Sequence, residues 1–117
     1  MNWNHLTQLE QLNTIKSESS NHPVLLFKHS TRCSISSMAL DRLQRAWNQE
    51  ELGDLKPYYL DLINNRDISN AIAQEFGVDH ESPQIIIISD GKAIYDNSHM
   101  GIAYHEVKRV NDNLQEA

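Results

Sequence analysis

The sequence contains a single cysteine, Cys33, among its 117 residues. One cysteine cannot form an internal disulfide, so the chain is typical of a protein from a reducing compartment such as the cytoplasm. The 6 histidines are scattered, with no pair at the spacing of metal ligands. With only one thiol available, this pattern predicts no metal site.

Basic residues and long apolar runs are also scarce. The chain has 10 Lys and Arg against 16 Asp and Glu, a net charge of −6, so it lacks the basic surface that nucleic-acid binding requires. The longest aliphatic run, Ile85 to Ile88, is far too short to cross a bilayer. Residues 1–5 have neither the basic nor the apolar segment of a signal peptide. We therefore expect a cytoplasmic protein that binds neither nucleic acid nor membranes.

Cofactor-binding motifs are missing too. There is no phosphate-binding Gly-Lys-Ser/Thr loop and no dinucleotide-binding glycine pattern. We expect no bound cofactor, so electrons for any redox chemistry must come from an external low-molecular-weight thiol. What is present, 39% apolar and 22% charged residues, fits one globular domain over residues 1–117.

The apolar spacing predicts alternating helices and strands. Thr7 and Glu10 have the spacing of a capping box for the first helix, and Asp90-Gly91 is a two-residue hairpin signal. In order, we expect a helix over 8–18, a strand over 24–28, a helix over 34–50, a strand over 58–62, a helix over 68–76, strands over 84–88 and 92–96, and a helix over 104–114.

The long helix after Cys33 has its own pattern. Apolar residues recur three and four apart and predict its buried face: Ile35, Met38, Ala39, Leu43, Ala46 and Trp47. Asp41 and Arg45 lie on the other face, four residues apart, where they are expected to pair.

This order of elements predicts an α/β thioredoxin-like fold, a mixed central β-sheet flanked by helices on both faces. Cys33 follows the first central strand and opens the long helix. Backbone N–H groups and the helix dipole favour a thiolate at that place. We therefore interpret Cys33 as the catalytic nucleophile, although a lone cysteine is more often simply a buried apolar residue.

Ser36 stands where a dithiol relative would carry a second cysteine. Residues three apart share a helix face, so the Ser36 hydroxyl is predicted to donate a hydrogen bond to the thiolate. It cannot attack a mixed disulfide, so an adduct on Cys33 must be resolved by another thiol. Ser34 adds a donor and Arg32 a positive charge beside the sulfur; a solvated Arg32 is the alternative.

Pro83 lies where thioredoxin-like proteins place a cis-proline facing the active-site sulfur. A cis bond there would expose the Ser82 backbone to a bound thiol or peptide, so we assign Ser82, Pro83 and Thr31 to substrate binding. An ordinary trans proline at a strand start is the alternative. His29, four residues before Cys33, either tunes the charge of the thiol or is a packed side chain.

Two separated segments carry a family resemblance. The run from Lys28 to Ser36, with its Cys-x-Ile-Ser core, and the run from His80 to Gln84 resemble the monothiol bacilliredoxins, the YtxJ-like or BrxC proteins. This resemblance implies reduction of mixed disulfides between proteins and bacillithiol, with Cys33 as nucleophile. The chain departs from the family at Ser34, where relatives usually have proline, and at Arg32, where they commonly have a small polar residue.

The leading hypothesis is a monothiol thiol–disulfide oxidoreductase that removes bacillithiol from S-thiolated client proteins through Cys33. The main alternative is a thioredoxin-fold interaction module in which Cys33 is not catalytic. A third interpretation is an iron–sulfur cluster carrier of the monothiol glutaredoxin kind. Such carriers usually have Gly-Phe between the cysteine and the serine, whereas this chain has Ser34-Ile35.

Overall fold

The strands of the computed structural model, which describes residues 1–116, form one mixed sheet in the order β1-β3-β2-β4-β5. β3 runs parallel to both β1 and β2, whereas β4 runs antiparallel to both β2 and β5. The strands are β1 (Asn4–His5), β2 (Val24–His29), β3 (Lys56–Asp61), β4 (Gln84–Ser89) and β5 (Lys92–Ser98). β2 therefore occupies the centre of the sheet.

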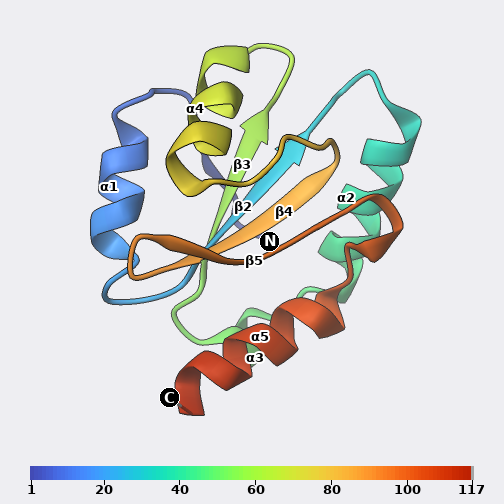
Figure 1. The fold of residues 1–117 in the computed structure, drawn as a ribbon. Helices are drawn as coiled ribbons and strands as arrows, with labels where there is room; N and C mark the ends of the chain where they lie inside the picture. The colour runs from blue at the N-terminus through green and yellow to red at the C-terminus, as the bar shows by residue number, and fades with distance from the viewer. Residues whose placement is uncertain (117) are drawn as a thin grey trace.

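Helices cover both faces of this sheet. Figure 1 shows α1 and α4 on one side and α2 and α5 on the other. The helices are α1 (Gln11–Glu18), α2 (Ser34–Ala46), α3 (Gln49–Leu52), α4 (Arg66–Phe76) and α5 (Tyr104–Glu116), with a 3₁₀ turn, η1, over His99–Gly101. The predicted thioredoxin-like arrangement is confirmed.

Alternation along β2 explains the two layers. Val24 and Leu26 belong to the apolar cluster that includes residues of α1 and α4. Leu25 and Phe27 belong to the cluster on the opposite face, which includes residues of α2 and α5. Every residue of β2 is buried, because a central strand between two helix layers has no solvent face.

The N-terminal segment differs from the sequence prediction. α1 begins at Gln11 and not at residue 8, and Thr7 is not its cap. The Gln11 side chain instead accepts hydrogen bonds from the N–H groups of Thr7 and Gln8, at 2.8 Å each. Strand β1, paired with β3, was not predicted, because two polar residues carry no periodic signal.

The predicted helix over 34–50 is two helices. α2 ends at Ala46, and the backbone of its C-cap residue, Trp47, is extended. The Asn48 side chain then caps α3 by accepting from Glu50 N–H at 3.2 Å. The predicted buried face is also partly wrong: Ile35 and Met38 are 54% and 66% exposed. The buried stripe of α2 runs instead through Ser36, Ala39 and Leu43. The predicted Asp41–Arg45 pair is confirmed at 2.9 Å.

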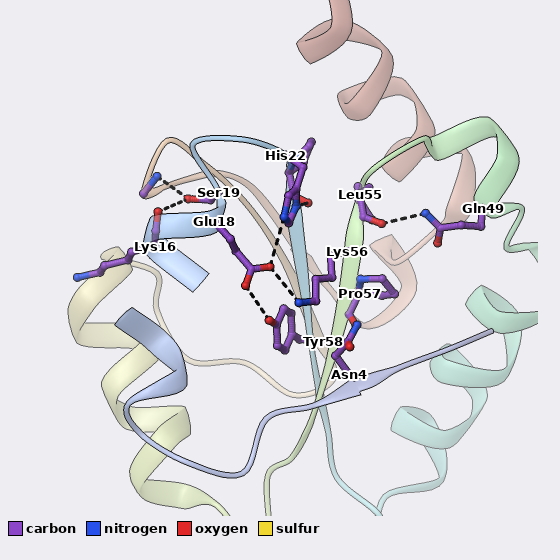
Figure 2. Close-up of polar contacts among 12 residues, drawn as sticks. Asn4, Lys16, Glu18, Ser19, His22, Gln49, Leu55, Lys56, Pro57 and Tyr58 are labelled. Atoms are coloured by element: carbon purple, nitrogen blue, oxygen red, sulfur yellow. Dashed lines mark hydrogen bonds and ion pairs between the residues drawn. The ribbon is translucent and has the colours of Figure 1, made fainter. Parts of the chain in front are cut away.

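A polar cluster ties α1 to β3 at the amino end of the sheet (Figure 2). Glu18 accepts a hydrogen bond from the Tyr58 hydroxyl at 2.9 Å and lies 3.4 Å from Lys56 Nζ and 3.6 Å from His22 Nε2. Cys33 follows the carboxyl end of β2, so this cluster and the cysteine lie at opposite ends of the sheet. The cluster stabilises the fold away from the thiol.

One cation lies inside the central strand. Lys28 is completely buried, and its Nζ lies 3.4 Å from Nδ1 of His80. Within residues 1–116, no acidic side chain forms a salt bridge with it. Burial lowers the pKa of Lys28 from 10.5 to about 8. The positive charge therefore destabilises the folded chain at neutral pH.

The variant Lys28→Met tests whether the buried Lys28 charge lowers the free energy of unfolding. The folded-state pKa of Lys28, about 8, lies below the ordinary value of 10.5. The unfolded chain therefore binds more protons between these two pH values, and the Lys28 charge makes the free energy of unfolding rise with pH there. Lys28→Met should be more stable than the parent at pH 7 by about 1–3 kcal/mol and should lack this rise.

Urea unfolding between pH 7 and pH 10 measures both effects. The matched control is Lys92→Met, because Lys92 is exposed on β5 and its replacement should leave the pH dependence unchanged. A Lys28→Met protein that is less stable at pH 7 and keeps the rise would contradict the account of a costly buried cation.

Candidate redox site

Cys33 lies at the junction between β2 and α2. The chain leaves β2 at His29 and turns through Ser30, and Cys33 N–H donates back to the Ser30 carbonyl at 3.2 Å. Cys33 is the N-cap residue of α2, with φ −111° and ψ 119°. Its side chain is partly exposed. The predicted position of the thiol at a strand-to-helix turn is confirmed.

The start of α2 is suited to hold a negative charge. The first N–H groups of a helix have no partner within it, and α2 is 13 residues long with no acidic residue in its first turn. The N-cap side chain is the one placed to accept from these groups. Since that side chain is Cys33, a thiolate would occupy the place where a capping oxygen usually lies.

Ser36 is completely buried under this turn. Its Oγ accepts a hydrogen bond from Ser30 N–H at 3.0 Å and lies 2.7 Å from Nδ1 of His29. These contacts link α2 to the end of β2. In the part of the chain that the structure describes, Ser36 makes no hydrogen bond with Cys33, so donation to the thiolate stays a prediction.

His29 contacts Ser36, and its role is the one for which the sequence allowed two alternatives. The residue is 5% exposed, and its ring packs near those of Phe27 and Tyr59, at centroid distances of 6.3 and 5.7 Å. Burial lowers the pKa of His29, and the charge of Asp61 opposes this only in part. The imidazole is therefore neutral at neutral pH. His29 is a packed histidine with one short polar contact.

Pro83 lies beside the end of β2. The peptide bond from Ser82 to Pro83 is cis, as predicted. Lys28 pairs with Gln84 in the antiparallel register of β2 and β4, which places Pro83, the residue before Gln84, near the end of β2. The Ser82 hydroxyl oxygen is buried and has no hydrogen-bond partner within residues 1–116. The two predicted segments therefore meet at one end of the sheet.

Three predicted site residues are exposed around the cysteine: Thr31, Arg32 and Ser34. Over residues 1–116, their side chains form no hydrogen bond or ion pair with the rest of the chain. These three side chains are therefore accessible to a substrate. Their roles stay predictions.

An apolar groove of about 290 Å³ adjoins α2 and was not predicted. The Arg42 guanidinium donates to the carbonyls of Ile102, at 2.9 Å, and His99, at 3.4 Å, and so fixes η1 against α2. His99 N–H in turn donates to the Pro83 carbonyl at 3.1 Å. The lining residues are Ile35, Met38, Ala39, Arg42, His99 and Met100. The sequence carries a signal for this groove in Ile35 and Met38, but their helical spacing predicts burial in the core, whereas both are exposed.

Among residues 1–116, no three His, Cys, Asp or Glu side chains gather closely enough to hold a metal ion. Over the same residues, no helix is long and apolar enough to cross a membrane.

The fold and the single-thiol motif define a thioredoxin-fold protein. A solved structure described as a candidate oxidoreductase with a thioredoxin fold is 30% identical, covers 90% of this chain and 89% of its own, and superposes with a TM-score of 0.76. The thioredoxin of Trypanosoma brucei brucei is 15% identical with a TM-score of 0.75, covering 99% of this chain and 93% of its own. The Fasciola hepatica thioredoxin is 15% identical with a TM-score of 0.68, covering 93% and 96%. The two thioredoxins show the fold alone.

A match along most of the chain identifies the family within this class. Residues 4–107 match the family model of the monothiol bacilliredoxin BrxC. The chain belongs to this family, as the resemblance of its two motifs predicted. Membership implies a bacilliredoxin-like role in thiol–disulfide chemistry, and the chain has a single cysteine to perform it.

Replacing Ser36 by alanine tests the link between α2 and β2. Ser36→Ala leaves the partly buried Ser30 N–H without an acceptor, so the free energy of unfolding should fall by about 1–3 kcal/mol. Ser37→Ala is the matched control, since Ser37 is exposed one position further along α2. It should change the stability by less than about 0.5 kcal/mol. Equal losses in the two variants, measured by urea unfolding, would contradict the role given to Ser36.

Proposed function

We propose that this protein is a monothiol thiol–disulfide oxidoreductase that removes bacillithiol from mixed disulfides on client proteins. The observation that carries the proposal is the combination of a cysteine at position 33 with a serine at position 36. The only thiol is the N-cap of a 13-residue helix, and a buried hydroxyl occupies the position of a second, resolving thiol. Such a site captures a thiol adduct but cannot release it alone.

The first step transfers bacillithiol to Cys33. The Cys33 thiolate attacks the bacillithiol sulfur of the mixed disulfide and forms a new S–S bond. The old S–S bond breaks, and its electron pair goes to the client sulfur, which takes a proton from water. The client thiol is thereby reduced, and Cys33 carries the disulfide. The unpartnered N–H groups at the start of α2 stabilise the attacking thiolate.

The second step requires an external thiol. A second bacillithiol, as its thiolate, attacks the bacillithiol sulfur on Cys33. Oxidised bacillithiol leaves, and Cys33 returns as a thiolate, which the helix terminus stabilises as a leaving group. The external thiol is therefore the reductant, and no bound cofactor is needed.

The remaining residues of the site have binding roles in this proposal. Ser82 and Pro83 form one wall, and the Ser82 backbone pairs with the bound thiol. Thr31 contacts the substrate from the loop before Cys33. Arg32 and Ser34 favour the thiolate by charge and by hydrogen bonding. The exposure of Thr31, Arg32 and Ser34 supports these roles.

The variant Cys33→Ala tests the reaction. With an S-bacillithiolated client and free bacillithiol, the parent protein should release the client thiol, and Cys33→Ala should release no more than buffer. Intact mass spectrometry of the client measures the release. Thr14→Ala, in α1 on the far layer, is a control that should retain activity. Equal release by the parent and Cys33→Ala would exclude Cys33 as the nucleophile.

A pH titration separates this function from that of an interaction module with an inert cysteine. The rate of Cys33 alkylation by iodoacetamide follows the fraction of thiolate. An unperturbed thiol gives a midpoint near pH 8.5, about the value expected for an inert cysteine. The proposed function predicts a clearly lower midpoint. A midpoint near that of a free thiol would favour the interaction module.

A further inference from the structure

Three of the six large apolar side chains that are exposed in residues 1–116 lie at the groove between α2 and η1. Ile35 is 54% exposed, Met38 is 66% exposed, and Met100, in η1, is 84% exposed. Ile35 lies only two residues after Cys33, in the first turn of α2. Apolar side chains that gather on a surface indicate contact with another molecule, so the surface beside the thiol is suited to a partner.

The walls of this groove are fixed before a partner binds. Arg42, on α2, donates through Nε and Nη2 to the Ile102 carbonyl and through Nη2 to the His99 carbonyl. His99 N–H donates to the Pro83 carbonyl at 3.1 Å, and His99 Nε2 lies 4.0 Å from a Glu81 oxygen. Only the unbranched methionine side chains need to adjust to an occupant, so little conformational entropy is lost when an apolar side chain enters.

A second hollow, of about 480 Å³, continues this surface along α2. It is lined by Met38, Asp41, Arg42, Arg45 and Ala46, and it shares Met38 and Arg42 with the groove. Arg45 pairs with Asp41 at 2.9 Å, whereas the recorded hydrogen bonds of Arg42 all go to uncharged carbonyls. Two arginines and one aspartate leave the hollow with a net charge of +1, although the whole chain carries −6. This charge favours an acidic partner.

We propose that this surface docks the client protein: the groove receives an apolar side chain close to the S-thiolated cysteine of the client, and Arg42 and Arg45 attract an acidic residue beyond it. This inference rests on the proposed function, which brings the client to Cys33 at the start of α2. Met38 and Arg45 are seven residues apart, about 10 Å along a helix axis. An extended client chain covers that length in about three residues, which sets the spacing between its apolar and acidic residues.

Peptide binding to the variant Cys33→Ala measures docking without any thiol chemistry. The probe peptide has serine in place of its cysteine, a leucine two residues away and a glutamate three residues beyond the leucine, and it is also made in the reverse order. In an NMR titration with the peptide order that binds more tightly, the amide signals of Ile35, Met38 and Met100 should shift and saturate. Replacing the peptide leucine by serine should weaken binding about tenfold. Replacing its glutamate by lysine should weaken binding about fivefold.

Substitutions at exposed positions of the protein test the two halves of the surface. Met100→Gln should weaken binding of the leucine peptide about fivefold. Arg45→Glu should weaken binding of the glutamate peptide about fivefold at low salt and less at high salt, because salt screens exposed charges. Leu9→Gln and Lys92→Glu are the matched controls, since they make the same kinds of change at exposed positions before α1 and on β5, away from the groove. Both should bind the peptide like the parent.

Several results would overturn the proposal. Equal binding of the leucine and serine peptides, or equal losses in Met100→Gln and Leu9→Gln, would mean that the groove does not select an apolar residue. Groove signals that shift when the protein alone is concentrated would assign the groove to a second copy of the chain, and shifts caused by bacillithiol alone would assign it to the small thiol. Because no thiol reacts in this experiment, docking can fail while Cys33 still releases bacillithiol, and docking can hold where the proposed function fails.

Discussion

The Ser36 hydroxyl, buried between β2 and α2, is the contact on which the site depends. It accepts from Ser30 N–H and meets His29 Nδ1, so the end of the central strand and the first turn of the helix are fixed to each other. Cys33 lies on the short turn between these two elements. The place of the thiol is thereby set by the strand and the helix, which are both rigid, and not by the loop alone.

The proposed one-thiol reaction accounts for a serine at position 36. In that reaction, a second cysteine there would compete with the external thiol for the adduct, whereas a serine leaves the adduct to be resolved from outside. Pro83 and η1 lie beside this end of the sheet. His99 N–H donates to the Pro83 carbonyl, and the Arg42 guanidinium donates to the His99 carbonyl. The exposed face of α2 remains open next to it.

Most of the fold could be predicted from the sequence, because the buried strands are continuous apolar runs bounded by turn residues. The turn at Asp90-Gly91 was predictable from its two turn residues, whereas the cis bond at Pro83 was expected only because thioredoxin-like proteins place a cis-proline there. Three features were not. β1 is too short to carry a period, Asn48 interrupts a helical pattern by capping a new helix, and the stripe through Ile35 and Met38 follows a helical period without being buried. At the site, spacing predicted Cys33 and Ser36, but the contact of Ser36 with His29 depends on how strand and helix pack.

The central claim is that Cys33 attacks the small-thiol sulfur and not the client sulfur. Time-resolved intact mass spectrometry of an equimolar mixture of the protein and an S-bacillithiolated client, without free bacillithiol, tests it most directly. The account predicts that the client loses one bacillithiol mass while Cys33 gains one, at equal rates. Accumulation of a disulfide between Cys33 and the client, or release of the client with no adduct on Cys33, would contradict it.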